Sequence, residues 1–222
     1  MWRDALLIAK KDLIIEMRSR VILNQVVPFA LVVVIFFGIA LNANSTLLRD
    51  AGGGLFWVAI LFACVLAIER SSSIESQDEA GEALRLCGID LGGMFLGKTL
   101  AVVLELIVLE IVLGVATFLV FHLVLNGLAI LLISGFFATV GLASSGTIYG
   151  ALTKSSNVKE TLLPLLFFPI VAPVLLAASR AWQLAINGYS SQGAVWLRIL
   201  IAFAVIYCVL GTILYEQILE TT

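Results

Sequence analysis

The sequence is poor in charged residues. Of its 222 residues only 13% are Asp, Glu, Lys or Arg, whereas 61% are hydrophobic, and the mean hydropathy is +1.12. Soluble domains carry about a quarter charged residues, so this composition is typical of an integral membrane protein. The formal net charge of −2 gives no reason to expect nucleic acid as a partner.

Residues that usually carry chemistry are also scarce. The three cysteines are far apart and form no CxxC pair, and His122 is the single histidine. The sequence contains no P-loop, no GxSxG and no HExxH motif. We interpret His122 as an interfacial residue rather than a haem or metal ligand, because no second histidine or cysteine cluster accompanies it. The sequence therefore predicts a non-catalytic chain that binds no metal or cofactor of its own.

Six apolar runs approach the roughly 20 residues that a helix needs to cross the hydrocarbon. They cover residues 21–41, 52–68, 99–121, 127–150, 161–178 and 195–215. No stretch between them is long enough for a soluble domain, so we expect a single all-α membrane domain of six spans over residues 1–222. Ten of the 13 Lys and Arg residues fall on one side of these spans. By the positive-inside rule, both termini and the loop at 69–98 are cytoplasmic.

The charged N-terminal segment is predicted to be a helix over residues 2–20. One face carries an apolar stripe, formed by Trp2, Ala5, Leu6, Ala9, Leu13 and Met17. We favour a helix that lies in the cytoplasmic membrane interface and leads into the first span. The alternative is a solvated basic segment that only sets the topology.

The fifth run contains three of the four prolines, Pro164, Pro169 and Pro173. Each proline removes a backbone donor and disturbs a helix. The pattern leaves two possibilities open. The helix breaks near its outer end, with Arg180 and Trp182 at the membrane interface, or it is kinked but packed.

Glu105 and Glu110 are the acids placed well inside a predicted span. An ionisable side chain at membrane depth is costly and indicates a specific role. Five residues apart on a helix of 3.6 residues per turn, the two side chains point about 140° away from each other, so we do not expect one shared site. For Glu110 we favour a structural hydrogen bond between helices over a direct functional role.

The most polar stretch, ERSSSIESQDEAGEALRLCGIDLGGMFLGK, covers residues 69–98 between the second and third spans. We predict a short acidic helix over 74–87, capped by the serines at 71–73 and ended by Gly88. Gly92, Gly93 and Gly97 would then allow a tight turn into the third span. Docking of a soluble partner explains such a helix, and a solvated connector is the alternative.

A resemblance bears on this choice. Residues 54–98 resemble the hallmark region of the CcmB family, the haem-exporter permeases of the cytochrome c maturation system. That family pairs a span ending in an LxxER turn with an acidic E…G stretch and a connector closing in FLGK. Here these are Leu66 with Glu69 and Arg70, then residues 75–81, then residues 95–98. Two further stretches are similar to the family: KDLIIEMRSR before the first span, and GTIYGALTKSSNVKETLLPLLFFPIVAPVLLAASRA across the fourth and fifth spans. The resemblance therefore covers nearly the whole chain.

The resemblance implies an ABC-2-like permease subunit in the bacterial cytoplasmic membrane. It implies a CcmA-like ATPase as a separate chain, CcmC-like and CcmD-like membrane subunits, and ATP-driven release of the haem-loaded chaperone CcmE. ATP and haem would both be held by partner subunits. The 69–98 loop would be the coupling element seated on the ATPase. The candidate coupling residues are Glu69, Arg70, Glu75, Asp78, Glu79, Gly81, Leu84, Gly97 and Lys98. The alternative is an ABC-2 permease that exports a lipid, a drug or a polysaccharide.

Overall fold

The computed structural model describes residues 1–20, 24, 26–40, 45–77, 90–121, 127–153 and 159–220. This part of the chain is helical and contains no strand. The helices are α1 (Trp2–Ser19), α2 (Val27–Ala40), α3 (Ser45–Gln77), α5 (Leu91–Val120), α6 (Leu128–Leu152), α7 (Lys159–Ile186) and α8 (Ser190–Glu220). The all-helical architecture expected from the sequence is therefore confirmed.

Within the described residues, five helices are long and apolar enough to cross a membrane. These segments are Asp50–Arg70, Leu91–Val120, Leu128–Leu152, Leu163–Ile186 and Ser190–Ile218. The first predicted span, residues 21–41, corresponds to α2, which has 14 residues. At about 1.5 Å per residue, α2 is roughly 21 Å long, shorter than a hydrocarbon core of about 30 Å. The structure thus supports five spans by length and composition, with α2 as a shorter apolar helix.

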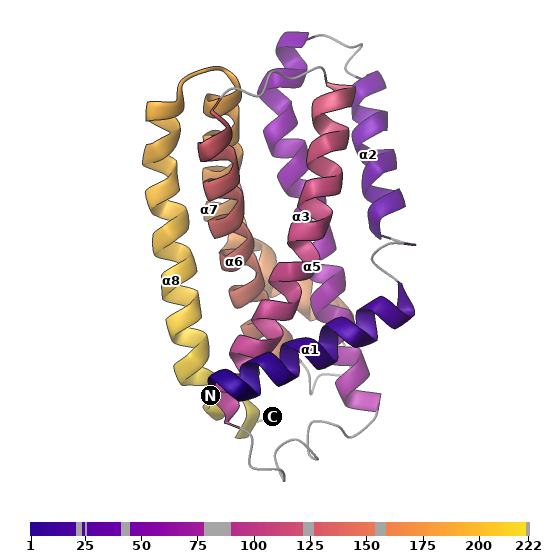
Figure 1. Ribbon diagram of the computed structural model, residues 1–222, viewed down its shortest axis with the longest axis vertical. Helices are drawn as coiled ribbons and strands as arrows, with labels where there is room; N and C mark the ends of the chain where they lie inside the picture. Colours follow the sequence, from indigo (N-terminus) through magenta and orange to yellow (C-terminus); the bar gives the residue numbers. More distant parts are fainter. Residues whose placement is uncertain are drawn as a thin grey trace.

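Helices α2 to α8 run alongside one another, and α1 lies across one end of the bundle (Figure 1). Both chain termini lie at this same end (Figure 1). The N-terminal ammonium lies 4.0 Å from Asp90, which precedes α5, so the start of α1 meets the start of α5. This end of the bundle therefore gathers the termini, α1 and the first turns of α5.

Small residues in α6 allow close packing of the bundle core. A Cβ atom at Gly141 would lie 3.1 Å from the Phe203 ring of α8. Gly146 faces Ile68 of α3, with no room for a side chain between them. Since a missing side chain lets two helix backbones approach, Gly141 lets α6 pack closely on α8, and Gly146 lets it pack closely on α3.

The prediction that the fifth span breaks near its outer end is wrong. Helix α7 is continuous from Lys159 to Ile186 and contains all three prolines. In a helix bundle of this kind neighbouring helices can satisfy the freed carbonyl groups, so prolines need not end a helix. Trp182, near the end of this helix, is buried and stacks on Phe56 of α3 with ring centroids 4.2 Å apart. Arg180 is exposed and donates to Gln183.

The boundaries predicted for the polar loop are also corrected. Helix α3 continues through Gln77, so residues 71–73 lie inside a helix and do not cap a new one at residue 74. Extending a formed helix costs far less than nucleating another, which favours this continuation over a cap. Helix α5 begins at Leu91 with Asp90 as its N-cap, and Gly92, Gly93 and Gly97 are helical rather than a turn. Residues 78–89, which include most of the predicted coupling helix, and His122 lie outside the described residues.

Candidate functional site

The end of the bundle crossed by α1 brings together several of the residues singled out in the sequence. Helix α1 sits on the first turns of α5, where two glycines four residues apart leave no side chain in the way. A Cβ atom at Gly97 would lie 2.6 Å from the carbonyl oxygen of Ala5 and 2.7 Å from Cβ of Ile8. One at Gly93 would lie 2.7 Å from the carbonyl oxygen of Met1. Helix α1 therefore packs directly on the backbone of α5 at Gly93 and Gly97, and we call this contact surface the seat of α1.

A small hydrophobic core lies beneath this seat. Ile8 of α1 packs in a cluster with residues of α5, α6 and α8, namely Met94, Phe95, Ile148, Ala151 and Tyr215. Ala5 and Ala9 are buried on the same face of α1. The inward face of α1 thus consists of Ala5, Ile8 and Ala9. Ala5 and Ala9 belong to the predicted apolar stripe, whereas Ile8 does not.

An ion pair fixes the other half of α1 to the end of the second span. Nε of Arg70 in α3 lies 3.1 Å from Oε2 of Glu16, and the two side chains are only 24% and 12% exposed. Asp12 also faces inward, with 15% of its side chain exposed. The charges of Arg70, Glu16 and Asp12 all act on the carboxyl group of Glu105 in α5. The contact therefore links α1, α3 and α5 electrostatically.

The structure describes five of the nine predicted coupling residues. Arg70 and Gly97 contact α1, and Lys98 is buried with 6% of its surface exposed. Glu69 is half-buried at the end of the apolar part of α3. Glu75 lies in the last turns of α3. Asp78, Glu79, Gly81 and Leu84 lie outside the described residues.

The outward face of α1 combines large apolar side chains with cations. Trp2, Leu6, Leu7, Ile14 and Met17 are all at least half exposed. Arg3, Lys10 and Arg18 are exposed as well. The acids Asp12 and Glu16 point to the bundle instead. Helix α1 thus presents an apolar and cationic surface away from the protein.

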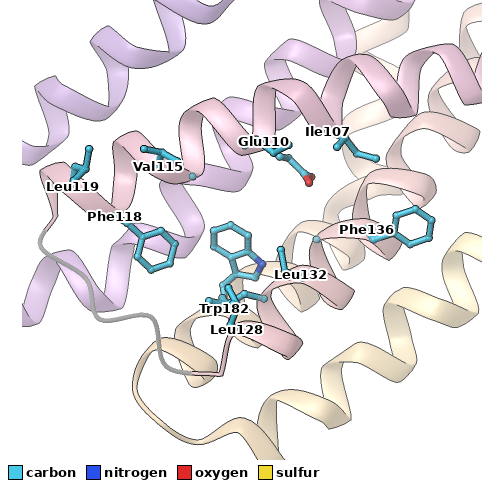
Figure 2. A pocket seen from close by; sticks show the side chains of 13 residues that line it. Ile107, Glu110, Val115, Phe118, Leu119, Leu128, Leu132, Phe136 and Trp182 are labelled. Carbon is cyan, nitrogen blue, oxygen red and sulfur yellow. The ribbon is translucent and has the colours of Figure 1, made fainter.

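Glu110 lies in a different environment from Glu105, as their spacing on the helix predicts. Its carboxyl Oε1 accepts a hydrogen bond from the hydroxyl of Thr139 in α6. Glu110 also lines a cavity between α5 and α6, together with Trp182 of α7 (Figure 2). The contact agrees with the favoured structural hydrogen bond between helices.

Two contacts at these sites were not anticipated from the sequence. Arg70 pairs with Glu16, and Glu110 pairs with Thr139. In both cases the partner lies far away along the chain, and no local sequence pattern marks it. The seat on α5 did leave a signal, since Gly93 and Gly97 form a GxxxG pair in GGMFLGK, a spacing typical of close helix contacts.

Taken with its composition, the bundle of long apolar helices defines a multi-pass integral membrane protein. The model of the CcmB protein family matches residues 3–221. The chain belongs to the CcmB family.

Curated relatives agree with the family match. Heme exporter protein B of Pseudomonas aeruginosa is 31% identical over 201 residues, which cover 90% of this chain and 90% of the relative. Heme exporter protein B of Haemophilus influenzae is 30% identical over 201 residues, covering 86% of this chain and 91% of the relative. Heme exporter protein B of Bradyrhizobium diazoefficiens is 30% identical over 190 residues, or 83% of each chain. The similarity therefore spans nearly the full length.

Proposed function

We propose that this chain is the membrane permease subunit of an ATP-driven haem-export complex in the bacterial cytoplasmic membrane, acting in cytochrome c maturation. The observation that carries the proposal is the end-to-end match to the CcmB family and to relatives named Heme exporter protein B. The apolar helical bundle supports a role inside the membrane rather than at its surface.

The complex requires further subunits. The sequence has no P-loop, so a separate CcmA-like ATPase supplies ATP hydrolysis. CcmC-like and CcmD-like membrane subunits complete the assembly. The complex uses ATP to release the haem-loaded chaperone CcmE. In this assignment ATP and haem are held by partner subunits, and the present chain transmits motion between them.

The contacts around α1 support a mechanism for transmission. The segment at 69–98 joins α3 to α5, and α1 is attached to both helices through Arg70 and through the seat at Gly97. An ATPase that moves this segment would therefore displace the ends of α3, α5 and α1 together. Rigid displacement of packed helices is a common way to carry a change from one subunit to the next.

The outward face of α1 supports placement at the cytoplasmic leaflet. Its exposed apolar side chains enter the boundary between headgroups and acyl chains, and Arg3, Lys10 and Arg18 meet anionic headgroups. Both termini lie at the end of the bundle that carries α1 (Figure 1). In this proposal both termini lie on the cytoplasmic side, and the distribution of Lys and Arg supports that orientation.

Deletion of this chain from its host tests the function. We expect loss of haem-stained c-type cytochromes together with accumulation of haem bound to the chaperone, because release is blocked after loading. Complementation with the wild-type gene restores both signals. Normal c-type cytochromes in the deletion strain would refute the proposal, and a defect confined to lipid or polysaccharide export would support the alternative permease function.

ATPase docking is tested separately with two loop variants. Leu84→Asp removes an apolar side chain that the sequence predicts at the centre of the docking surface, where a few residues carry most of the binding energy. Glu79→Gln removes one charge at the predicted rim, worth about 0–1 kcal/mol. We expect Leu84→Asp to lose the ATPase in a pull-down from membranes with equal permease levels, and Glu79→Gln to retain it. Wild-type recovery with Leu84→Asp would show that this segment is not the docking element.

A further inference from the structure

A cavity between α5 and α6 is not used by the proposed function. It has a volume of about 550 Å³ and is lined by α5 and α6, with Trp182 of α7 also contributing. Small-molecule sites typically measure about 300–1,000 Å³, so the cavity is large enough for a ligand. Figure 2 shows that the carboxyl of Glu110 points from α5 toward the space that the Trp182 ring enters from the other side.

The wall of the cavity is apolar, and one side of it is open. Ile111, Val115 and Leu132 line the cavity and are 62%, 57% and 64% exposed. These residues lie in the apolar segments Leu91–Val120 and Leu128–Leu152. A molecule dissolved in the hydrocarbon of the membrane can therefore enter sideways between α5 and α6.

Glu110 gives this apolar cavity one polar anchor. Oε1 of Glu110 accepts from Thr139, whereas Oε2 makes no hydrogen bond within the described part of the chain. An oxygen that faces an apolar cavity rather than water is disfavoured while it has no hydrogen-bond partner, because it has lost its hydration without replacement. The free oxygen therefore calls for a donor brought by a ligand.

Trp182 is a second polar group with unused capacity at the cavity. It is 7% exposed, and its indole Nε1–H is buried with no acceptor within the described residues. A ligand hydroxyl that donates to Glu110 places its own oxygen, an acceptor, in the part of the cavity that Trp182 lines. The two groups together match a hydroxyl better than an apolar end.

We infer that this cavity binds a membrane-resident lipid alcohol, with its hydrocarbon chain between α5 and α6 and its hydroxyl donating to Oε2 of Glu110. At about 30 Å³ per water-sized group, 550 Å³ holds roughly 18 such groups, which is the size of one long hydrocarbon chain. A cationic amphiphile matches less well, because both charges would lose their hydration inside hydrocarbon. A membrane-spanning helix of a partner also matches less well. Such a helix has about 20 residues and is at least 10 Å wide, so its volume is far larger than that of the cavity.

Gly114 offers a way to block the cavity without disturbing the protein. It lines the cavity, and a Cβ atom built on it meets no heavy atom within 4 Å. Gly114→Leu therefore fills the space that the ligand needs. Val108→Leu is the matched control, because Val108 is an exposed residue of the same helix that does not line the cavity.

The test is photolabelling of the complete complex in its native membranes with diazirine-bearing hexadecanol. We expect label on the cavity-facing residues of α5 and α6 in wild type and in Val108→Leu, and loss of most of that label in Gly114→Leu. Equal labelling of Gly114→Leu at the same membrane level, or label spread evenly over the outer helices, would overturn the assignment.

Competition in the wild-type complex tests the polar anchor without any variant. Hexadecanol should displace the label about 2- to 10-fold better than hexadecyl methyl ether, which lacks the donor, as expected for one net hydrogen bond. Equal displacement by the ether, or stronger displacement by hexadecylamine or by haem, would overturn the alcohol assignment. Lipids extracted from purified wild-type complex should include a hydroxylated neutral lipid that is depleted in Gly114→Leu, and identical extracts would contradict the proposal.

Discussion

The seat of α1 on α5 can be tested with a pair of identical substitutions in one helix. Gly97→Ala introduces a Cβ atom 2.6 Å from the carbonyl oxygen of Ala5 and 2.7 Å from Cβ of Ile8, distances that force α1 to shift. Overpacking of this kind costs about 1–3 kcal/mol. Gly114→Ala introduces the same atom where nothing lies within 4 Å. Both changes gain about 1 kcal/mol of helix propensity, so this gain cancels in the comparison.

The difference between the two variants is expected to appear in thermal unfolding of the purified protein in detergent. For a chain of this size 1 kcal/mol corresponds to about 2–4 °C, so Gly97→Ala should melt roughly 2–12 °C below Gly114→Ala. A second assay is maleimide labelling of Ala9→Cys in a background where the native cysteines are replaced by alanine. Ala9 is buried, so its thiol should react faster when Gly97→Ala lifts α1. Equal melting and equal labelling in the two backgrounds would refute the seat.

Three further outcomes follow from the other contacts. Arg70→Met should increase thiol exposure on α1 because it removes the ion pair with Glu16, and adding Glu16→Met should restore protection, since an apolar pair tolerates burial; no recovery in the double variant would contradict the ion pair as an anchor. Cysteines at Ser45 and Glu75 report the topology, and an impermeant outside reagent should label the first and not the second; the reverse pattern would invert it. Glu110→Gln should keep more c-type cytochrome than Glu110→Leu, because Gln still accepts from a hydroxyl; equal and full activity of both would remove Glu110 from the functional residues.

Local composition was sufficient to predict the class of protein and most of its helices. Five of the six predicted apolar runs correspond to helices long enough to span a membrane, because hydropathy is summed over neighbouring residues and needs no tertiary contact. The family resemblance was carried in the same way, by short motifs in register along the chain, and it is confirmed by the match over residues 3–221.

Helix ends were less predictable, because they depend on what surrounds them. The prolines of α7 predict a break only if the freed carbonyls find no partner, and the helix continues to Ile186. The serines at 71–73 resemble a cap, yet α3 continues through Gln77 because an existing helix propagates at little cost.

Partners of the polar side chains were decided by the tertiary structure alone. The spacing of Glu105 and Glu110 predicted that they point in different directions from α5. It did not predict that Glu105 lies near the charges around Arg70, or that Glu110 accepts a hydrogen bond from Thr139. Periodicity tells which face of a helix a residue occupies, whereas its neighbour is chosen by the packing of whole helices. Gly97 shows the same limit. The sequence analysis assigned Gly97 to a turn, and only the fold placed it in a helix with Ala5 and Ile8 of α1 against it.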